Sequence, residues 1–208
     1  MTEEKVKLIT GSLLHDIGKV IYRQGTDRRN HSTAGGDYLK DEVGITDRVV
    51  LDCVKYHHAA MLKGAALDDN SLAYIVYLAD NIAAFADRRK KAESDEKGFE
   101  LAVPLQSIFN ILNGNHEEFY YQPGDMGDDN GINYPSAEKK KFSEAFYTKI
   151  RQRLTDNLKG LQWTEEYINS LMAVMEANLT YIPSSTAKSE LADISLYDHV
   201  KLTAAIAA

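Results

Sequence analysis

Two ionisable side chains interrupt an apolar helical pattern near the start of this 208-residue sequence. Residues 11–23, GSLLHDIGKVIYR, place His15 and Asp16 beside an apolar face. That face is formed by Leu8, Ile9, Leu13, Ile17, Val20 and Ile21. Burying an imidazole and a carboxylate costs several kcal/mol unless each finds a partner. The fold must therefore bring either partner side chains or a metal ion to this segment.

The spacing of apolar residues predicts a mainly α-helical chain. We expect helices over residues 3–23, 31–43, 46–60, 71–91, 137–160, 164–179 and 195–208. Ser71 and Thr164 are expected N-caps, and Ser195 with Asp198 has the spacing of a capping box. The helix over 71–91 has the clearest stripe, formed by Leu72, Ile75, Val76, Ala79, Ile82, Ala83 and Ala86 and widened by Leu78 and Phe85.

The stretch between 92 and 136 has a different character, because it is charged at first and then rich in turn residues. Only short runs such as EFYYQ could form strands there. We therefore expect three parts: a helical core over 1–91 that carries most of the candidate ligands, a loop-rich or partly β insertion over 92–136, and a helical segment over 137–208 that completes the core.

Composition narrows the class of protein. No run approaches the roughly 20 apolar residues of a membrane span, and the N-terminal MTEEKVKL has no secretory character, so we expect a cytoplasmic protein with no membrane partner. Cys53 is the only cysteine, which excludes an internal disulfide and a thiolate zinc cluster. The net charge of -7 argues against indiscriminate nucleic-acid binding, although 19–29 and 88–91 are locally basic.

Histidines recur on the faces that the helical pattern buries. This holds for five of the six, namely His15, His31, His57, His58 and His199, while Asp80 lies at the rim of such a face. One histidine in this position is more often a hydrogen-bonded core residue than a ligand. Five of them, with Asp16 and Asp80 to balance charge, indicate a metal site. His116 lies in polar NGNHEEF and is expected at the surface.

Nitrogen and oxygen ligands suit one or two divalent ions of Mn, Fe, Co, Ni or Zn, two ions lying about 3.5 to 4 Å apart. Such a site activates water and stabilises charge on a phosphoryl group. Lys19, one turn after His15, either holds a phosphate oxygen or is a solvated lysine. Asp87, on the same side of its helix as Asp80, is either a support for the site or, as we favour, part of a surface ion pair.

The motif LLHDIGK resembles the signature of HD-domain metal-dependent phosphohydrolases. HSTAGGDYL, YHH and YLADNIAAFADRR resemble the later motifs of that family. An ordinary HD domain carries a further histidine helix ahead of the HD pair, and nothing upstream of His15 supplies it. SLYDHVKLTAAIAA, with His199, resembles that helix displaced to the far end of the chain. A circularly permuted HD domain is implied, with its two termini close together.

The permuted arrangement is similar to the N-terminal HD domain of the large Csm-type (III-A) subunit of type III CRISPR-Cas effector complexes, over essentially all 208 residues. The resemblance implies a metal-dependent single-stranded DNA nuclease with His15, Asp16 and Lys19 as catalytic residues. It also implies other subunits and a guide RNA as partners, and palm domains further along a longer chain.

Roles for individual residues follow from the same resemblance. His15 and Asp16 would be core metal ligands, Asp80 would close the first site, His31 with His57 or His58 would serve a second ion, and His199 would be the displaced ligand. Candidate nucleic-acid contacts are Lys19, Arg23, Arg88 and Arg89, although cations after a helix also match its dipole.

Two other functions stay open. One is a small-nucleotide HD phosphohydrolase, and the other is a non-catalytic HD scaffold within a complex. HD-GYP enzymes follow their paired histidine with Glu and a G-Y-P element, whereas Ala59 and Ala60 stand here, which argues against cyclic dinucleotide hydrolysis.

Overall fold

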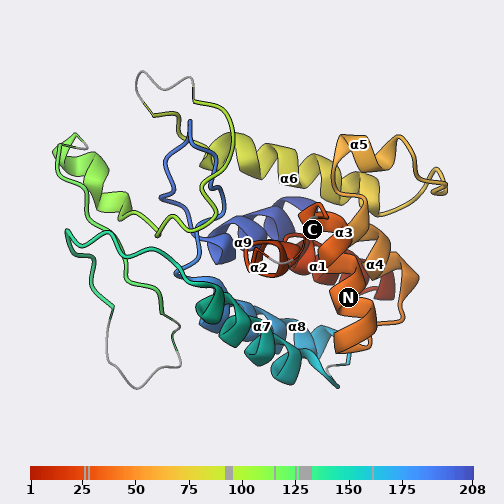
Figure 1. Cartoon of the computed structure of the whole chain (residues 1–208). Helices are drawn as coiled ribbons and strands as arrows, with labels where there is room; N and C mark the ends of the chain where they lie inside the picture. Colours follow the sequence, from red (N-terminus) through yellow and green to blue (C-terminus); the bar gives the residue numbers. More distant parts are fainter. Residues whose placement is uncertain are drawn as a thin grey trace.

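The structure is a computed structural model that describes residues 1–25, 27, 29–91, 96–114, 116–124, 126, 133–160 and 162–208. These residues form a helical bundle with a loop-rich segment at one side (Figure 1). The elements are α1 (Glu3–Leu14), α2 (Gly18–Tyr22), α3 (His31–Tyr38), the π-helix η1 (Leu39–Val43), α4 (Arg48–Lys55), α5 (Ala59–Leu62), α6 (Ala73–Asp87), the 3₁₀-helix η2 (Ile108–Asn113), α7 (Glu144–Leu158), α8 (Glu165–Leu179) and α9 (Leu196–Ala207). The predicted mainly α-helical fold is confirmed.

Helix α9, at the end of the chain, packs against both α1 and α6 (Figure 1). Ser195 begins it as predicted, since its hydroxyl accepts a hydrogen bond from the Asp198 amide at 2.9 Å. In its last turn, Ala207 packs on a small apolar cluster that includes Leu8 of α1. The expectation that the two ends of the fold lie together is therefore confirmed.

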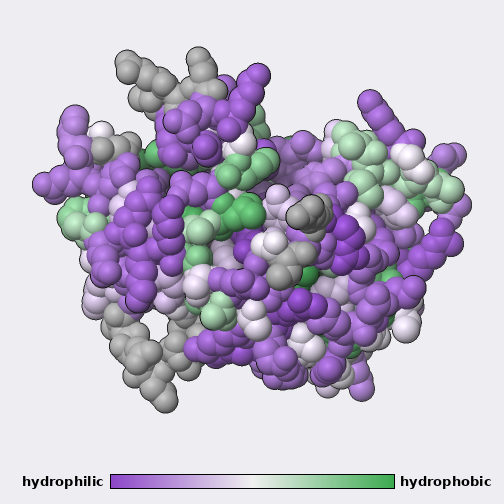
Figure 2. All heavy atoms as spheres, in the orientation of Figure 1, coloured by the Kyte–Doolittle hydropathy of each residue, from purple (hydrophilic) through white to green (hydrophobic). Residues whose placement is uncertain are grey.

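The main core lies between α1, α9 and the surrounding helices α2, α3, α4, α7 and α8. Side chains from each of these helices or their turns are fully buried, for example Leu14, Ile17, Val54, Ile150, Leu179 and Val200. Burying such a side chain contributes about 1.5 to 3 kcal/mol. Figure 2 shows that one face of the bundle is mostly hydrophilic, with hydrophobic residues confined to small patches. No helix among the described residues combines the length and apolarity needed to cross a membrane.

The helix expected over 3–23 is interrupted at residues 15–17, which form a tight turn. Backbone hydrogen bonds there span three residues, from the Ile17 amide to Leu14 at 3.0 Å and from the Lys19 amide to Asp16 at 2.9 Å. The turn directs α2 onto α3, and the two backbones touch at Gly18. A Cβ atom at Gly18 would lie 1.8 Å from the carbonyl oxygen of His31, so only glycine fits.

Helix α4 ends at Lys55 rather than at residue 60. His57 and His58 therefore lie beyond the helix, and their helical spacing from Val54 was the wrong reason for placing them near the core. His57 is nevertheless fully buried, because the chain turns inward after Lys55, while His58 is partly exposed.

Helix α6 begins at Ala73, with Leu72 rather than Ser71 at the N-cap position. Its inner side buries Val76, Ala79 and Ala83. Its outer side exposes Ile75, Leu78, Ile82 and Phe85, which the sequence had assigned to the buried stripe. That part of the prediction is wrong, because α6 lies at the edge of the bundle and packs on one side only (Figure 1).

The predicted starts of the helices over 137–160 and 164–179 differ in outcome. Helix α7 begins at Glu144, several residues later than expected, where the Ser143 hydroxyl accepts a hydrogen bond from the Phe146 amide. Thr164 does stand at the N-cap position of α8, but its side chain makes no capping hydrogen bond.

The predicted insertion is loop-rich where the structure describes it, apart from η2. EFYYQ forms no strand, since Tyr120 makes only isolated bridges to Gln106 and Ser136. Parts of this stretch, such as 92–95 and 127–132, lie outside the described residues. The connection between α8 and α9 runs beside the insertion, for the Gln106 amide donates to the Ala192 carbonyl at 2.8 Å.

Candidate metal centre

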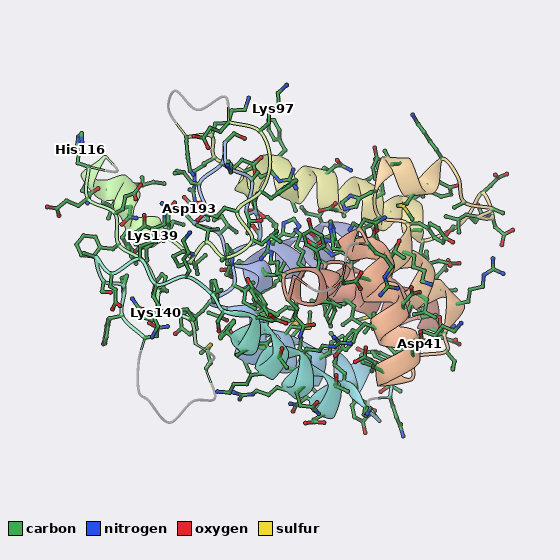
Figure 3. All side chains as sticks on the ribbon, viewed as in Figure 1. Asp41, Lys97, His116, Lys139, Lys140 and Asp193 are labelled. Carbon is green, nitrogen blue, oxygen red and sulfur yellow. The ribbon has the colours of Figure 1, made fainter. Side chains whose placement is uncertain are left out.

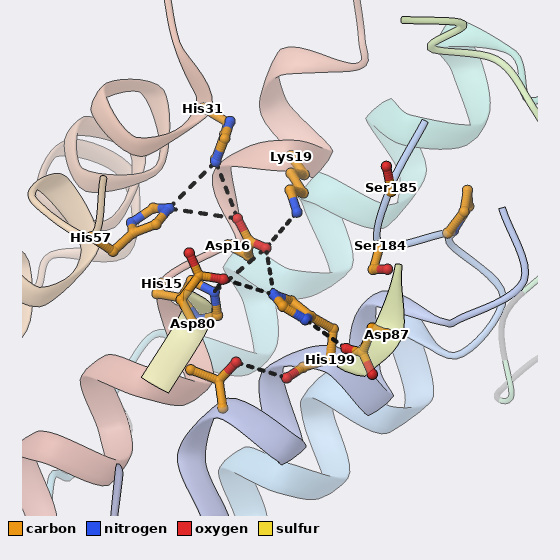
Figure 4. Close-up of polar contacts among 12 residues, drawn as sticks. His15, Asp16, Lys19, His31, His57, Asp80, Asp87, Ser184, Ser185 and His199 are labelled. Carbon is orange, nitrogen blue, oxygen red and sulfur yellow. Dashed lines mark hydrogen bonds and ion pairs between the residues drawn. The ribbon is translucent and has the colours of Figure 1, made fainter. Parts of the chain in front are cut away.

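The structure brings all seven candidate ligands to one place, and Figure 4 labels each of them except His58. The ligands come from five parts of the chain: the turn between α1 and α2, the start of α3, the segment after α4, the middle of α6 and the first turn of α9. They are His15, Asp16, His31, His57, His58, Asp80 and His199. The Asp16 carboxylate, 2 % exposed, lies at the centre of the group. Residues that are 184 positions apart, His15 and His199 (199 − 15), thus face the same carboxylate.

The two oxygens of Asp16 face different partners. Oδ2 lies 3.5 Å from His15 Nε2 and 3.4 Å from His199 Nε2. Oδ1 lies 3.2 Å from His31 Nε2 and 3.7 Å from His57 Nε2. Asp16 therefore joins two sets of candidate ligands, one on each of its oxygens.

The first set is His15, Asp16, Asp80 and His199, all buried, with one ligand atom from each lying within 4.8 Å of the others. Asp80 Oδ1 is 3.1 Å from His199 Nε2 and 3.5 Å from His15 Nε2. The set combines two imidazoles with two carboxylates. This mixed nitrogen and oxygen environment suits a divalent first-row transition metal.

The second set is His31, His57 and His58, again with one ligand atom from each lying within 4.8 Å of the others; His57 is buried, while His31 and His58 are partly exposed. His31 Nε2 lies 2.8 Å from His58 Nε2 and 3.4 Å from His57 Nε2. Three imidazole nitrogens that converge in this way repel one another when protonated, and a shared cation removes the repulsion.

Three imidazole rings are oriented by a partner at Nδ1. His15 Nδ1 lies 2.7 Å from the Ser12 carbonyl, and His57 Nδ1 lies 2.7 Å from the Val54 carbonyl. A carbonyl oxygen can only accept, so Nδ1 carries the proton in each ring. In both rings, Nε2 is left to face Asp16, which is the orientation that metal-binding histidines adopt.

His199 is held by a carboxylate instead, because its Nδ1 donates to Asp87 Oδ2 at 2.8 Å. The surface ion pair that we favoured for Asp87 is therefore wrong, and the support role is the one the structure shows. Its position seven residues after Asp80, on the same side of α6, was the signal. What the sequence lacked was the position of α9, which alone brings a histidine to that side.

Carboxylates hold the buried histidines of the first set in the protonated form. Burial opposes a charge on His15, but the negative charge of Asp16, with help from Asp80, outweighs it and raises the pKa to about 9. Burial likewise opposes protonation of His199, and hydrogen bonds to Asp16, Asp80 and Asp87 raise its pKa to about 10. The protonated rings of His15 and His199 thus carry positive charge beside the carboxylates of Asp16 and Asp80.

The pKa values of four other groups are lowered, namely those of His57, His58, Asp16 and Asp80. Burial lowers the pKa of His57 well below its usual value, and burial with the neighbouring His31 lowers that of His58 to about 4. Burial would raise the pKa of Asp16, but the charges of Lys19 and His15 lower it well below its usual value. The pKa of Asp80 is lowered as well, because its contacts with His15 and His199 outweigh burial.

These residues fit a bound divalent cation. His15 Nε2 is buried and has no hydrogen-bond partner, although buried polar atoms are nearly always paired. The surrounding donors are imidazole nitrogen and carboxylate oxygen. Cys53, the only thiol, is buried in a separate apolar cluster and takes no part.

A cavity of about 600 Å³ opens beside the ligands, and its lining includes Asp16, His31, His58 and Asp80. Lys19 and Arg88 also line it. Lys19 Nζ lies 2.5 Å from Asp16 Oδ2, so this lysine is bound at the site rather than solvated. Ser184 and Ser185, between α8 and α9, form part of the opposite wall (Figure 4).

The remaining sequence-predicted cations are engaged elsewhere. Arg23 borders the cavity but is buried, and its guanidinium donates to the carbonyls of Pro183 at 2.5 Å and Ser184 at 3.1 Å. Arg89 Nε lies 2.9 Å from Asp193 Oδ2. Nucleic-acid contacts by these two arginines stay a prediction. His116 is exposed beside η2, away from the helical bundle, as expected (Figure 3).

Comparison with known proteins agrees with this geometry. Residues 1–84 match the family model of the HD domain. The chain is 38% identical over 212 residues to the CRISPR system single-strand-specific deoxyribonuclease Cas10/Csm1 (subtype III-A) of Streptococcus thermophilus, covering 100% of this chain and 28% of the relative. The crystal structure of Csm1 in T. onnurineus is similar with a TM-score of 0.72 and 26% identity, over 100% of this chain and 28% of that one.

A Csm1-Csm4 subcomplex of the type III-A CRISPR-Csm interference complex is also similar, with a TM-score of 0.68 and 25% identity over 100% of this chain and 27% of that one. Residues 1–84 are thus similar to the HD-domain family. The relatives that the chain matches over its whole length are Cas10/Csm1 proteins of subtype III-A. The chain spans 28% of the length of the S. thermophilus relative.

Proposed function

We propose that this chain is a metal-dependent nuclease domain that hydrolyses phosphodiester bonds in single-stranded DNA. The observation that carries the proposal is the Asp16 carboxylate, whose two oxygens face two separate sets of ligand atoms. Paired metal sites joined by a carboxylate suit phosphoryl transfer, because both the attacking and the leaving oxygen need stabilisation.

The proposed ligands divide in the same way as the geometry. His15, Asp16, Asp80 and His199 would hold one ion, and His31, His57 and His58 would hold a second with Asp16 between them. The donor set accepts Mn, Ni, Co, Fe or Zn. A bound divalent ion would activate a water molecule and stabilise negative charge on the phosphoryl oxygens.

The chain's own side chains would prepare that chemistry. The Ser12 and Val54 carbonyls and the Asp87 carboxylate keep three imidazoles turned toward Asp16. Lys19, 13 % exposed at its side chain, would hold a phosphate oxygen at the cavity floor. Arg88, whose side chain is about half exposed and loosely paired with Glu190, would contact a neighbouring phosphate.

The relatives give the substrate and partners of the proposal. The S. thermophilus relative is named a single-strand-specific deoxyribonuclease, and the solved structures include a Csm1-Csm4 subcomplex. We infer that this chain acts on single-stranded DNA as one domain of a longer subunit with palm domains. That subunit would assemble with other Csm subunits and a guide RNA.

A cleavage assay tests the proposal. Purified protein is incubated with Mn²⁺, Ni²⁺ or Co²⁺ and labelled single-stranded DNA, double-stranded DNA, RNA or small nucleotides. The wild type should cleave single-stranded DNA only with metal, and the double variant His15→Ala with Asp16→Ala should be inactive. His116→Ala is the matched control, because it removes an exposed histidine outside the site.

Each other outcome identifies a different error. Equal activity in the double variant and the wild type would show that the assigned site is wrong. Turnover of small nucleotides alone would favour a nucleotide phosphohydrolase, for which a 600 Å³ cavity is also large enough. No turnover of any substrate would favour a scaffold.

A further inference from the structure

Phe99 presents an aromatic ring in the cavity that contains the candidate metal ligands. The residue is 65 % exposed. It makes no ring–ring or cation–π contact within the described part of the chain. Pockets that bind ligands are lined mainly by apolar and aromatic side chains, with a few polar groups that fix the orientation of the ligand.

The backbone of this residue is fixed on both sides. The Lys188 amide donates to the Gly98 carbonyl at 3.0 Å, and the Glu100 amide donates to the Thr186 carbonyl at 2.8 Å. Phe99 itself bridges Ala187. Gly98 has φ of +100°, a conformation that favours glycine and turns the chain directly ahead of the ring. The backbone that carries the ring is therefore held in place, while the residue itself stays 65 % exposed.

The lining of the cavity around Phe99 combines charged and apolar groups. The ligand carboxylates Asp16 and Asp80 line it, with Lys19 beside Asp16. Arg88 and Phe99 also line it, with hydroxyls of the connection between α8 and α9. A nucleic-acid strand combines the same kinds of group, because charged phosphates alternate with flat apolar bases.

We propose that Phe99 stacks against an unpaired nucleobase of the strand whose phosphate lies at the metal centre. The assignment rests on the proposed function and deepens it, since it gives a physical basis for acting on single strands. Bases in a duplex are stacked on both faces and cannot cover the ring, whereas bases in a single strand are free to do so. DNA and RNA bases share this chemistry, so both are included in the test.

Binding of a fluorescently labelled strand, followed by anisotropy with a chelator present to prevent cleavage, measures the contact. Phe99→Ala should weaken binding of a single-stranded thymidine or uridine oligomer about five- to a hundredfold, the range for losing one stacked base. Phe99→Tyr should restore most of the affinity. Phe109→Ala is the matched control, because Phe109 is 64 % exposed in the same insertion and does not line the cavity.

A strand of abasic residues separates stacking from other effects. The difference between wild type and Phe99→Ala should disappear on that strand, since it offers no base. Equal affinity of Phe99→Ala and Phe109→Ala for the normal strand, or an equal loss on the abasic strand, would overturn the assignment. Absence of cleavage by the wild type would instead refute the proposed function, and the binding measurement would still decide the role of Phe99.

Discussion

Asp87 Oδ2 accepts a hydrogen bond from His199 Nδ1 at 2.8 Å, on the side of the ring away from the other candidate ligands. The opposite nitrogen, Nε2, faces Asp80 Oδ1 at 3.1 Å. Asp80 and Asp87 are two turns apart on α6, so a single helix fixes both the orientation of this imidazole and the carboxylate that it meets. Such outer partners commonly change metal affinity 10- to 100-fold.

Replacing Asp87 should therefore weaken metal binding without removing a ligand. We expect Asp87→Ala to lower the affinity for Mn²⁺ about 10- to 100-fold, because His199 loses both its orientation and a neighbouring negative charge. Asp87→Asn keeps an acceptor and should lose less. Calorimetric titration of the chelator-treated protein measures this, with Asp156→Asn, at an exposed position on α7, as control. An unchanged affinity in Asp87→Ala would contradict the role.

The raised histidine pKa values predict how stability depends on pH in the metal-free protein. The pKa of His15, about 9, and that of His199, about 10, lie above the 6.5 of a free histidine. Their contribution to the free energy of unfolding is complete below pH 6.5 and is lost as pH rises toward 9 and 10. Urea denaturation with a chelator at pH 7, 8 and 9 should show falling stability. His199→Gln should flatten this profile, and a profile as steep as that of the wild type would refute the assignment.

The contact between α2 and α3 predicts a strong effect of a small substitution. Gly18→Ala should destabilise the protein by about 3 kcal/mol, because the new methyl group would collide with the His31 backbone and force the two helices apart. Since His31 is a candidate ligand, metal affinity should fall as well. Gly64→Ala is the control, for nothing lies within 4 Å of a Cβ atom there. Equal thermal stability of the two variants would show that the contact is absent.

Replacing Arg23 should lower the stability of the fold rather than remove a contact with nucleic acid. Arg23→Met leaves the Pro183 and Ser184 carbonyls without their donor and should lower the free energy of unfolding by about 2 to 4 kcal/mol. Arg88→Met should change stability by less than about 0.5 kcal/mol, since its ion pair is long and exposed. Chemical denaturation of both variants measures the difference. A stable Arg23→Met that binds DNA poorly would restore Arg23 as a nucleic-acid contact.

The sequence predicted which residues meet, although for His57 and His58 the helical spacing behind that prediction was the wrong reason. It was not sufficient to predict how the rings are held. His57 is oriented by the carbonyl of Val54, and every residue has a carbonyl, so no side-chain pattern marks it. Asp87 needed the position of α9, which depends on contacts far apart in the chain.

The helical pattern also predicted one unbroken helix over residues 3–23, which the structure divides into α1 and α2. The turn at residues 15–17 follows from the close approach of α2 to α3, a tertiary contact that periodicity does not record. Helix α6 shows the converse limit. Its apolar residues encircle much of the helix, and Phe85 remains 90 % exposed because the bundle covers only one side. Periodicity identifies an apolar face but not whether a partner packs on it.

The position of His199 on the last helix also sets an order in time. Translation delivers His15, Asp16, His31, His57, His58 and Asp80 early, and the histidine between Asp80 and Asp87 arrives more than a hundred residues later. A nascent chain that has not yet released α9 from the ribosome lacks one side of the first ligand set. Completion of the cluster therefore reports that the whole helical bundle has been synthesised and closed.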